Sequence, residues 1–122
     1  MRATLVLPFP PSTNHYWRRC GSRTIISTAG KQFRVDVVRA VIEQFGEAVP
    51  FVGPVRCTVD LYQPDRRRRD LDNYDGKALF DALTKALVWE DDSQVRERTG
   101  RIHPKHDDFD VGACIISIEE IS

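Results

Sequence analysis

Alternating and clustered apolar residues predict four strands along the chain. Residues 55–62 alternate between apolar and polar side chains, which is typical of a strand with one buried face, and Pro64 ends the pattern. Residues 3–9 form a short apolar run that prolines break, because proline removes a donor from a strand ladder. Residues 94–102 and 111–119 predict two further strands, and the last of them is apolar enough for the interior of a sheet.

Apolar residues at helical spacing predict two helices. They recur at intervals of three and four within residues 30–48, where Ser27 or Thr28 stands at the position of an N-cap. Residues 73–88 repeat the pattern with a wider apolar face. Residues 12–24 are rich in basic and aromatic side chains and are expected to form a loop.

These elements predict an α+β fold, in which a mixed sheet of about four strands is covered by two helices. The composition fits one soluble domain spanning residues 1–122, since 41% of the residues are hydrophobic and 30% are charged. The three cysteines show no CxxC spacing, which argues against a disulfide framework or a cysteine zinc site. The N-terminal apolar stretch is too short for a membrane span or signal peptide. We therefore expect a cytoplasmic protein without a membrane partner.

Charge is distributed unevenly although the formal net charge is zero. Residues 1–69 contain 12 lysine and arginine residues against 5 acidic ones, whereas residues 70–122 contain 6 against 13. Such a division is compatible with a basic surface for a polyanion beside an acidic pocket for a cation.

Paired carboxylates follow directly after the densest basic run, in RRRRDLDN at residues 66–73. In an extended chain Asp70 and Asp72 would face one way with Cα atoms roughly 6.5 to 7 Å apart, close enough to converge on one cation. The second helix would return the chain to an acidic turn containing Asp91 and Asp92. Several carboxylates at one point repel each other unless a divalent cation neutralises them, which favours a Mg²⁺ site. Lys77 lies near enough to contact a phosphate there.

Each of these features also has a structural interpretation. Asp72 is a good helix N-cap and Asp75 a good first-turn residue, while an acidic turn after a helix is commonly only polar. An arginine run is often a solvated loop, and in extended chain at most two or three of its four members can contact one backbone. Tyr16 and Trp17 could stack on exposed bases or belong to the core. The histidines in HPKH lack nearby cysteines, which argues against zinc.

Taken together, the motifs resemble the RusA family of Holliday junction resolvases. The likeness lies in PFPPSTN, RRRRDLDN, KALFDALTKA and WEDDSQV, in that order, and spans about residues 5–95. It implies a RusA-like fold and an endonuclease that binds four-way DNA junctions as a homodimer. Such an enzyme nicks DNA in symmetric pairs with Mg²⁺, or Mn²⁺ as a substitute, and uses no small-molecule cofactor. Small resolvases of this kind are often encoded by phages or prophages.

The resemblance also implies roles for individual residues. Asp70, Asp72 and Asp92 match the acidic metal ligands, and Lys77 matches the catalytic lysine. Asn73 has a supporting role, and Asp91 is the alternative third ligand if the register of the turn differs. The expected DNA contacts are Asn14, Arg18, Arg19, Arg23, Arg66, Arg67, Arg68 and Arg69.

One departure from the family pattern concerns the spacing before Lys77. The family usually has two residues between the asparagine and the lysine, whereas this chain has Tyr74, Asp75 and Gly76. One inserted residue rotates all later residues of an ideal helix by about 100°, which could turn Lys77 away from the site. Gly76 could absorb the extra residue as a bulge or as a late helix start.

Two other functions are compatible with the sequence. A non-catalytic junction-binding protein would keep the fold with a site disabled by the inserted residue, and only a cleavage assay separates it from the nuclease. A small Mg²⁺-dependent nucleotide hydrolase would need a base-binding feature, which the sequence lacks; turnover of a free nucleotide tests it.

Overall fold

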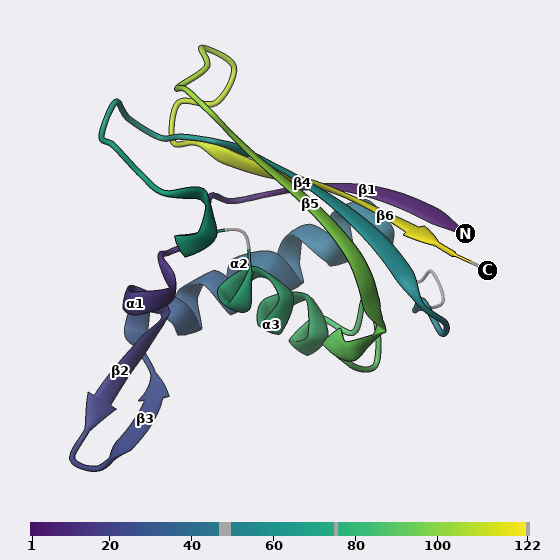
Figure 1. The fold of residues 1–122 in the computed structure, drawn as a ribbon, viewed down its shortest axis with the longest axis horizontal. Helices are drawn as coiled ribbons and strands as arrows, with labels where there is room; N and C mark the ends of the chain where they lie inside the picture. Colours follow the sequence, from purple (N-terminus) through teal and green to yellow (C-terminus); the bar gives the residue numbers. More distant parts are fainter. Residues whose placement is uncertain (47–49, 75, 122) are drawn as a thin grey trace.

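A mixed four-stranded sheet forms the centre of the molecule, as the alternating patterns predict. The computed structural model describes residues 1–46, 50–74 and 76–121. The strands are β1 (Arg2–Leu7), β4 (Val55–Tyr62), β5 (Val95–His103) and β6 (Ala113–Glu120), in the spatial order β1-β6-β4-β5. β6 is antiparallel to both of its neighbours, whereas β4 and β5 are parallel (Figure 1).

The parallel pair β4 and β5 determines where the candidate site lies. Parallel neighbours need a crossover connection, and here it consists of the 3₁₀ helix η1 (Leu71–Asn73), α3 (Lys77–Lys85) and the 3₁₀ helix η2 (Asp92–Gln94). The arginine run, the paired aspartates and the acidic turn therefore all belong to one connection between adjacent strands.

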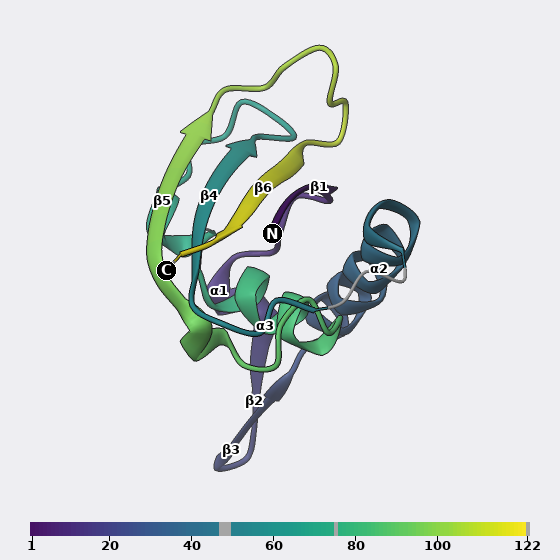
Figure 2. The ribbon, with the colours of Figure 1, turned by 90° about the vertical axis from the view of Figure 1, so that its right-hand side faces the viewer.

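Both long helices lie on the same side of the sheet, and neither covers the other side (Figure 2). The alternation in β4 explains this, because Val59 and its neighbours at every second position are buried while the residues between them are more exposed. Leu5, Val37, Leu79 and Ile116 join Val59 in one core between the sheet and the helices. The predicted α+β fold is confirmed.

The helix boundaries differ from the predicted ones in ways that capping explains. α2 spans Thr28–Phe45 because the Ser27 hydroxyl accepts a hydrogen bond from the Gly30 N–H, which settles the choice of N-cap. Gly46 ends α2 at a φ of 64°, so the predicted continuation to residue 48 is wrong at Gly46, and residues 47–49 lie outside the described residues. α3 is shorter than the predicted 73–88, since it begins at Lys77.

The expected loop at residues 12–24 is wrong, because this segment contains regular structure. It forms the short helix α1 (Thr13–Tyr16) and the strands β2 (Trp17–Cys20) and β3 (Arg23–Ile26), which pair as an antiparallel hairpin. The hairpin projects away from the central sheet (Figure 1). Gly21, at a φ of 65°, closes its two-residue turn.

No helix in the described part of the chain is long and apolar enough to cross a membrane.

Candidate active site

The arginine run divides into three exposed side chains and one that stabilises its own loop. Arg66, Arg67 and Arg68 are exposed. The Arg69 side chain is only 7% exposed, and its guanidinium donates to both carboxylate oxygens of Asp65, at 2.7 and 3.1 Å. Hydrogen bonding to Arg69 lowers the pKa of Asp65 well below its usual range.

Aromatic rings complete the setting of Arg69. Its guanidinium lies 5.4 Å from the ring centroid of Phe9 and 5.9 Å from that of Tyr74. Arg69 is thus engaged within the protein and connects the proline-rich segment after β1 to the segment after η1. Arg66, Arg67 and Arg68 stay exposed, although Arg67 also donates to the Asp65 carboxylate at 3.4 Å, and their contacts with phosphate remain a prediction.

The paired aspartates lie where an extended backbone becomes a turn of 3₁₀ helix. Asp70 has φ −91° and ψ 133°, so its backbone is extended, whereas Asp72 lies within η1. The extended interpretation assumed that strand alternation places both carboxylates on one side of the chain. It does not apply here, because only Asp70 has an extended backbone. Leu71 packs against the hydrophobic core between them. Asp72 is not the N-cap of the long helix either, because α3 begins only after Gly76.

The helix that carries Lys77 starts late, directly after Gly76. Gly76 is the N-cap of α3, and its carbonyl accepts the first helical hydrogen bond from the Phe80 N–H at 3.0 Å. Lys77 is the first residue of the helix and is exposed. The late start that glycine permits is confirmed, while Asp75 and its predicted first-turn role lie outside the described residues.

The two aspartates of the acidic turn differ in their hydrogen bonding. The Asp91 carboxylate accepts a hydrogen bond from the Ser93 N–H at 3.1 Å and caps η2; hydrogen bonding to Ser93 lowers its pKa. The Gln94 side chain accepts from the Asp91 N–H and donates to the carbonyls of Phe51 and Gly53. The turn is thus held rigidly, and Asp92 presents its carboxylate to solvent from within it.

A small cleft between α3 and β5 connects Asp92 to the start of α3. Its volume is about 260 Å³, and it is lined by Phe80, Asp92, Val95, Arg96, Glu97 and Arg98. The Arg98 guanidinium lies 5.7 Å from the centroid of the Phe80 ring, and one of its nitrogens would be 3.0 Å from a Cβ at Gly76. Arg98 therefore reaches from β5 to the helix start that carries Lys77.

Sequence reasoning did not single out Arg96 and Arg98. The sequence did contain a signal for them. Arg96 and Arg98 are two residues apart, so they lie on the same face of a predicted strand. On the face that the helices cover, apolar residues are expected instead. Two arginines in such a position indicate a cleft.

Within the described residues, four acidic side chains of the β4–β5 crossover have no partner: Asp70, Asp72, Glu90 and Asp92. Glu43, Asp107 and Asp110 elsewhere in the chain have none either. Asp70, Asp72 and Asp92 are exposed, and none makes a side-chain hydrogen bond or ion pair within the described residues. Asp60, Asp65 and Asp81 by contrast are each paired with an arginine.

Unpaired carboxylate oxygens are the ligands that Mg²⁺ prefers, so the chemistry of this donor set fits the metal. Across residues 1–46, 50–74 and 76–121 no three metal-binding side chains are close enough to hold an ion as they stand. Binding would therefore draw Asp70, Asp72 and Asp92 together.

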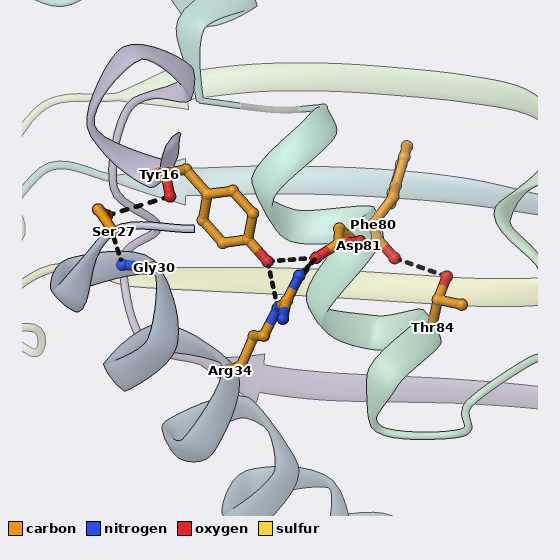
Figure 3. Close-up of polar contacts among 7 residues, drawn as sticks. All are labelled: Tyr16, Ser27, Gly30, Arg34, Phe80, Asp81 and Thr84. Carbon is orange, nitrogen blue, oxygen red and sulfur yellow. Dashed lines mark hydrogen bonds and ion pairs between the residues drawn. The ribbon is translucent and has the colours of Figure 1, made fainter. Parts of the chain in front are cut away.

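A partly buried polar cluster connects the three helices α1, α2 and α3 (Figure 3). The Tyr16 hydroxyl in α1 donates to the Asp81 carboxylate in α3, and Arg34 in α2 donates to the Tyr16 oxygen at 2.8 Å and to Asp81 at 2.7 Å. Burial raises the pKa of Tyr16 to about 12. The cluster fixes α3, and with it Lys77, against the base of the β2–β3 hairpin.

The predicted N-terminal DNA contacts gather on and beside that hairpin. Asn14, Arg18 and Arg19 line one cavity of about 580 Å³, and Arg23 is exposed on β3. Thr13 connects this region to the paired aspartates, since its hydroxyl donates to the Asn73 carbonyl at 3.2 Å. Asn73, for which a supporting role is predicted, thus links the base of the hairpin to η1 through its carbonyl.

Comparison with known proteins identifies the relatives of this chain. Residues 8–109 match the family model described as endodeoxyribonuclease RusA. The chain is 47% identical over 92 residues to a crossover junction endodeoxyribonuclease RusA of Shigella sonnei (strain Ss046) and 46% identical over 92 residues to that of Escherichia coli (strain K12). Each match covers 75% of both chains. The corresponding protein of Enterobacteria phage 82 is 47% identical over 91 residues, which cover 75% of this chain and 74% of the phage protein. The chain therefore belongs to the RusA family.

Proposed function

We propose that this protein is a metal-dependent endodeoxyribonuclease that resolves four-way DNA junctions. The observation that carries the proposal is that Asp70, Asp72 and Asp92, the acidic residues of the RusA-like motifs, are exposed and unpartnered within the described residues of the crossover between β4 and β5. Family membership supports the substrate, because the relatives are named crossover junction endodeoxyribonucleases. The exposed Arg66, Arg67 and Arg68 directly precede the first carboxylate and suit phosphate binding.

In this proposal Asp70, Asp72 and Asp92 hold Mg²⁺, or Mn²⁺ in its place. When bound, the ion neutralises the carboxylates and activates a water molecule for attack on the phosphodiester. Gln94 and the Asp91 cap keep the turn fixed, so that Asp92 is presented at a constant position.

Lys77 stabilises the developing charge on the phosphate from the first turn of α3. The arginines hold the DNA strand so that the reacting phosphate stays over the site. Paired, symmetric nicks require two sites related by a two-fold axis, and a homodimer supplies them.

An assay with a synthetic four-way junction tests the proposal. The protein is incubated with the junction and with a linear duplex of the same sequence, in Mg²⁺ or in EDTA. Paired nicks in the junction, absent from the duplex and from the EDTA reaction, are expected. Nicking of both DNAs, or cleavage that persists in EDTA, would contradict it.

The second candidate is a junction-binding protein that does not cleave. The inserted residue before Lys77 favours it, as does the separation of metal-binding side chains within the described residues. Specific binding of the junction without any nick in Mg²⁺ or Mn²⁺ would establish this alternative.

A further inference from the structure

The cavity at the base of the β2–β3 hairpin combines charge with an aromatic wall. It has a volume of about 580 Å³ and is lined by Thr13, Asn14, His15, Trp17, Arg18, Arg19, Thr24 and Ser27. Arg18 and Arg19 are exposed, and neither forms an ion pair within the described residues. A surface that only attracted the DNA backbone would need the arginines alone, so the aromatic wall calls for a separate explanation.

The two neighbouring aromatic residues have different tasks. Tyr16 is fully buried, so it is not available to a ligand. Trp17 is partly exposed, lines the cavity and packs edge-on against the Tyr16 ring at a centroid distance of 4.9 Å. The sequence alone allowed both residues as candidates for base stacking. Of the two, only Trp17 is accessible in the structure.

The support beneath Trp17 is rigid. The Tyr16 hydroxyl is fixed between Arg34 and Asp81 (Figure 3). The Ser27 hydroxyl donates to the Tyr16 carbonyl at 3.0 Å, and a Cβ at Gly30 would lie only 2.5 Å from that carbonyl oxygen. A preorganised stacking surface binds a flat ring without first having to become ordered.

The cavity also adjoins the candidate active site. Thr13 in its wall donates a hydrogen bond to the Asn73 carbonyl, and Asn73 follows Asp72 directly in η1. One hydrogen bond therefore separates the wall of the cavity from the segment that carries the paired aspartates.

We propose that this cavity receives one nucleobase, unstacked from the DNA strand next to the cleaved phosphodiester. Trp17 stacks on the base, and Arg18 and Arg19 contact the adjoining phosphates. Polar side chains of the wall such as Asn14 and Thr24 contact the edge of the base. Stacking on an aromatic side chain with arginines alongside is how proteins bind unpaired bases. This inference rests on the proposed function, because the DNA is placed by the nuclease site.

Tryptophan fluorescence tests the contact without any cleavage. Trp89 is fully buried and donates to the Thr84 hydroxyl at 2.7 Å, so Trp17 is the tryptophan that a ligand can reach. Addition of the junction in EDTA is expected to quench the emission of the wild-type protein and to leave that of Trp17→Phe unchanged. Equal changes in both proteins would overturn the proposal.

A cycle of protein and DNA changes tests stacking against mere packing. Trp17→Leu keeps an apolar side chain but removes the aromatic face, so its junction affinity in EDTA should fall about tenfold, whereas Trp17→Phe should stay within about threefold. With an abasic nucleotide at the position that occupies the cavity, the loss caused by Trp17→Leu should disappear. Persistence of the full loss at every abasic position tested beside the cut would show that Trp17 does not contact a base.

The outcomes separate this inference from the proposed function. If Trp17→Leu binds and nicks the junction as the wild-type protein does, the base site is wrong and the nuclease stands. If the wild-type protein does not nick but its fluorescence is quenched through Trp17, the base site stands and the nuclease is wrong. Thermal melting of both variants identifies any loss of junction affinity that comes from unfolding. If Trp17→Leu is unfolded, the abasic series with the wild-type protein and Trp17→Phe decides whether Trp17 contacts a base.

Discussion

At the scale of single residues, the partners of each charged side chain decide its role. Asp70, Asp72 and Asp92 are exposed and unpartnered within the described residues, whereas Asp91 is engaged as a cap. The sequence identified all four but left Asp91 and Asp92 as alternatives. Only the folded turn separates them, because which carboxylate bonds to the Ser93 N–H depends on local backbone geometry. The proposed metal ligands themselves stay a prediction.

The two aspartates of the acidic turn should therefore respond differently to substitution. Asp92→Asn removes the charge of a proposed metal ligand and should reduce junction cleavage at least about 100-fold with an unchanged melting temperature. Asp91→Asn keeps a capping acceptor and should stay within about tenfold of wild-type cleavage. Single-turnover cleavage rates measure both. The reverse ranking would assign the third ligand to Asp91.

Lys77 should contribute to the chemical step and not to DNA binding. Lys77→Ala is expected to lower the cleavage rate of bound junction by about 100-fold to 1,000-fold, as for loss of one group that stabilises charge in the transition state. Junction affinity in EDTA should change less than threefold. A wild-type rate for this variant would mean that the inserted residue has turned Lys77 away from the phosphate.

At the scale of elements, patterns that repeat were predictable and short irregular ones were not. The β4 strand and α2 follow from apolar periodicity, and their predicted positions are close to the observed ones. The β2–β3 hairpin was missed because its strands have only four residues each, too few to show an alternation, although Gly21–Ser22 is a common two-residue turn. η1 was missed because its 3₁₀ turn depends on Leu71 packing against the core.

The Tyr16 cluster should stabilise the packing of the three helices. Tyr16→Phe keeps the buried ring but leaves Arg34 and Asp81 without the hydroxyl between them, so we expect a loss of about 1 to 3 kcal/mol in unfolding free energy. Denaturant unfolding at pH 7 measures it. Phe33→Leu, a change of apolar shape in the same helix layer, serves as a control for core disturbance. A Tyr16→Phe protein as stable as the wild type would show that the cluster contributes nothing.

The same cluster gives a pH dependence with a definite sign. Because the pKa of Tyr16 is raised from 10.0 to about 12, the folded protein keeps this proton at pH values where the unfolded chain loses it. The stability that this group contributes is fully present below about pH 10 and declines as the pH rises through 12. The stability difference between wild type and Tyr16→Phe should therefore narrow over that window. A difference that stays constant would contradict the assignment.

At the scale of the whole molecule, a chain of zero net charge can bind DNA only if its charges are separated in space. Arg66, Arg67 and Arg68 are exposed after β4, and Arg18 and Arg19 are exposed on the hairpin, on either side of the Thr13–Asn73 contact. The sequence predicted such a separation from the unequal charge of its two halves. It could not predict that Arg69 is internal, because that depends on Phe9 and Asp65 meeting it in the folded state.

The arginine loop offers a matched pair of substitutions. Arg68→Ala should reduce the slope of log affinity against log salt concentration by about 1, with an unchanged melting temperature, since one phosphate contact is lost. Arg69→Ala should instead lower the melting temperature, because the Asp65 carboxylate and the two aromatic rings lose their contacts with the Arg69 guanidinium. Junction titrations at several salt concentrations and thermal melts measure both. An unchanged melting temperature for Arg69→Ala would contradict its internal role.

The proposed function depends above all on the unpartnered carboxylates of the β4–β5 crossover forming the metal site of a junction nuclease. The anomalous scattering of Mn²⁺ in a crystal of the protein would locate that metal directly. We expect one or two peaks within about 2.5 Å of carboxylate oxygens of Asp70, Asp72 and Asp92, with the three side chains drawn closer together. Peaks only at other acidic residues, in a protein that still cleaves junctions with Mn²⁺, would contradict the proposed site.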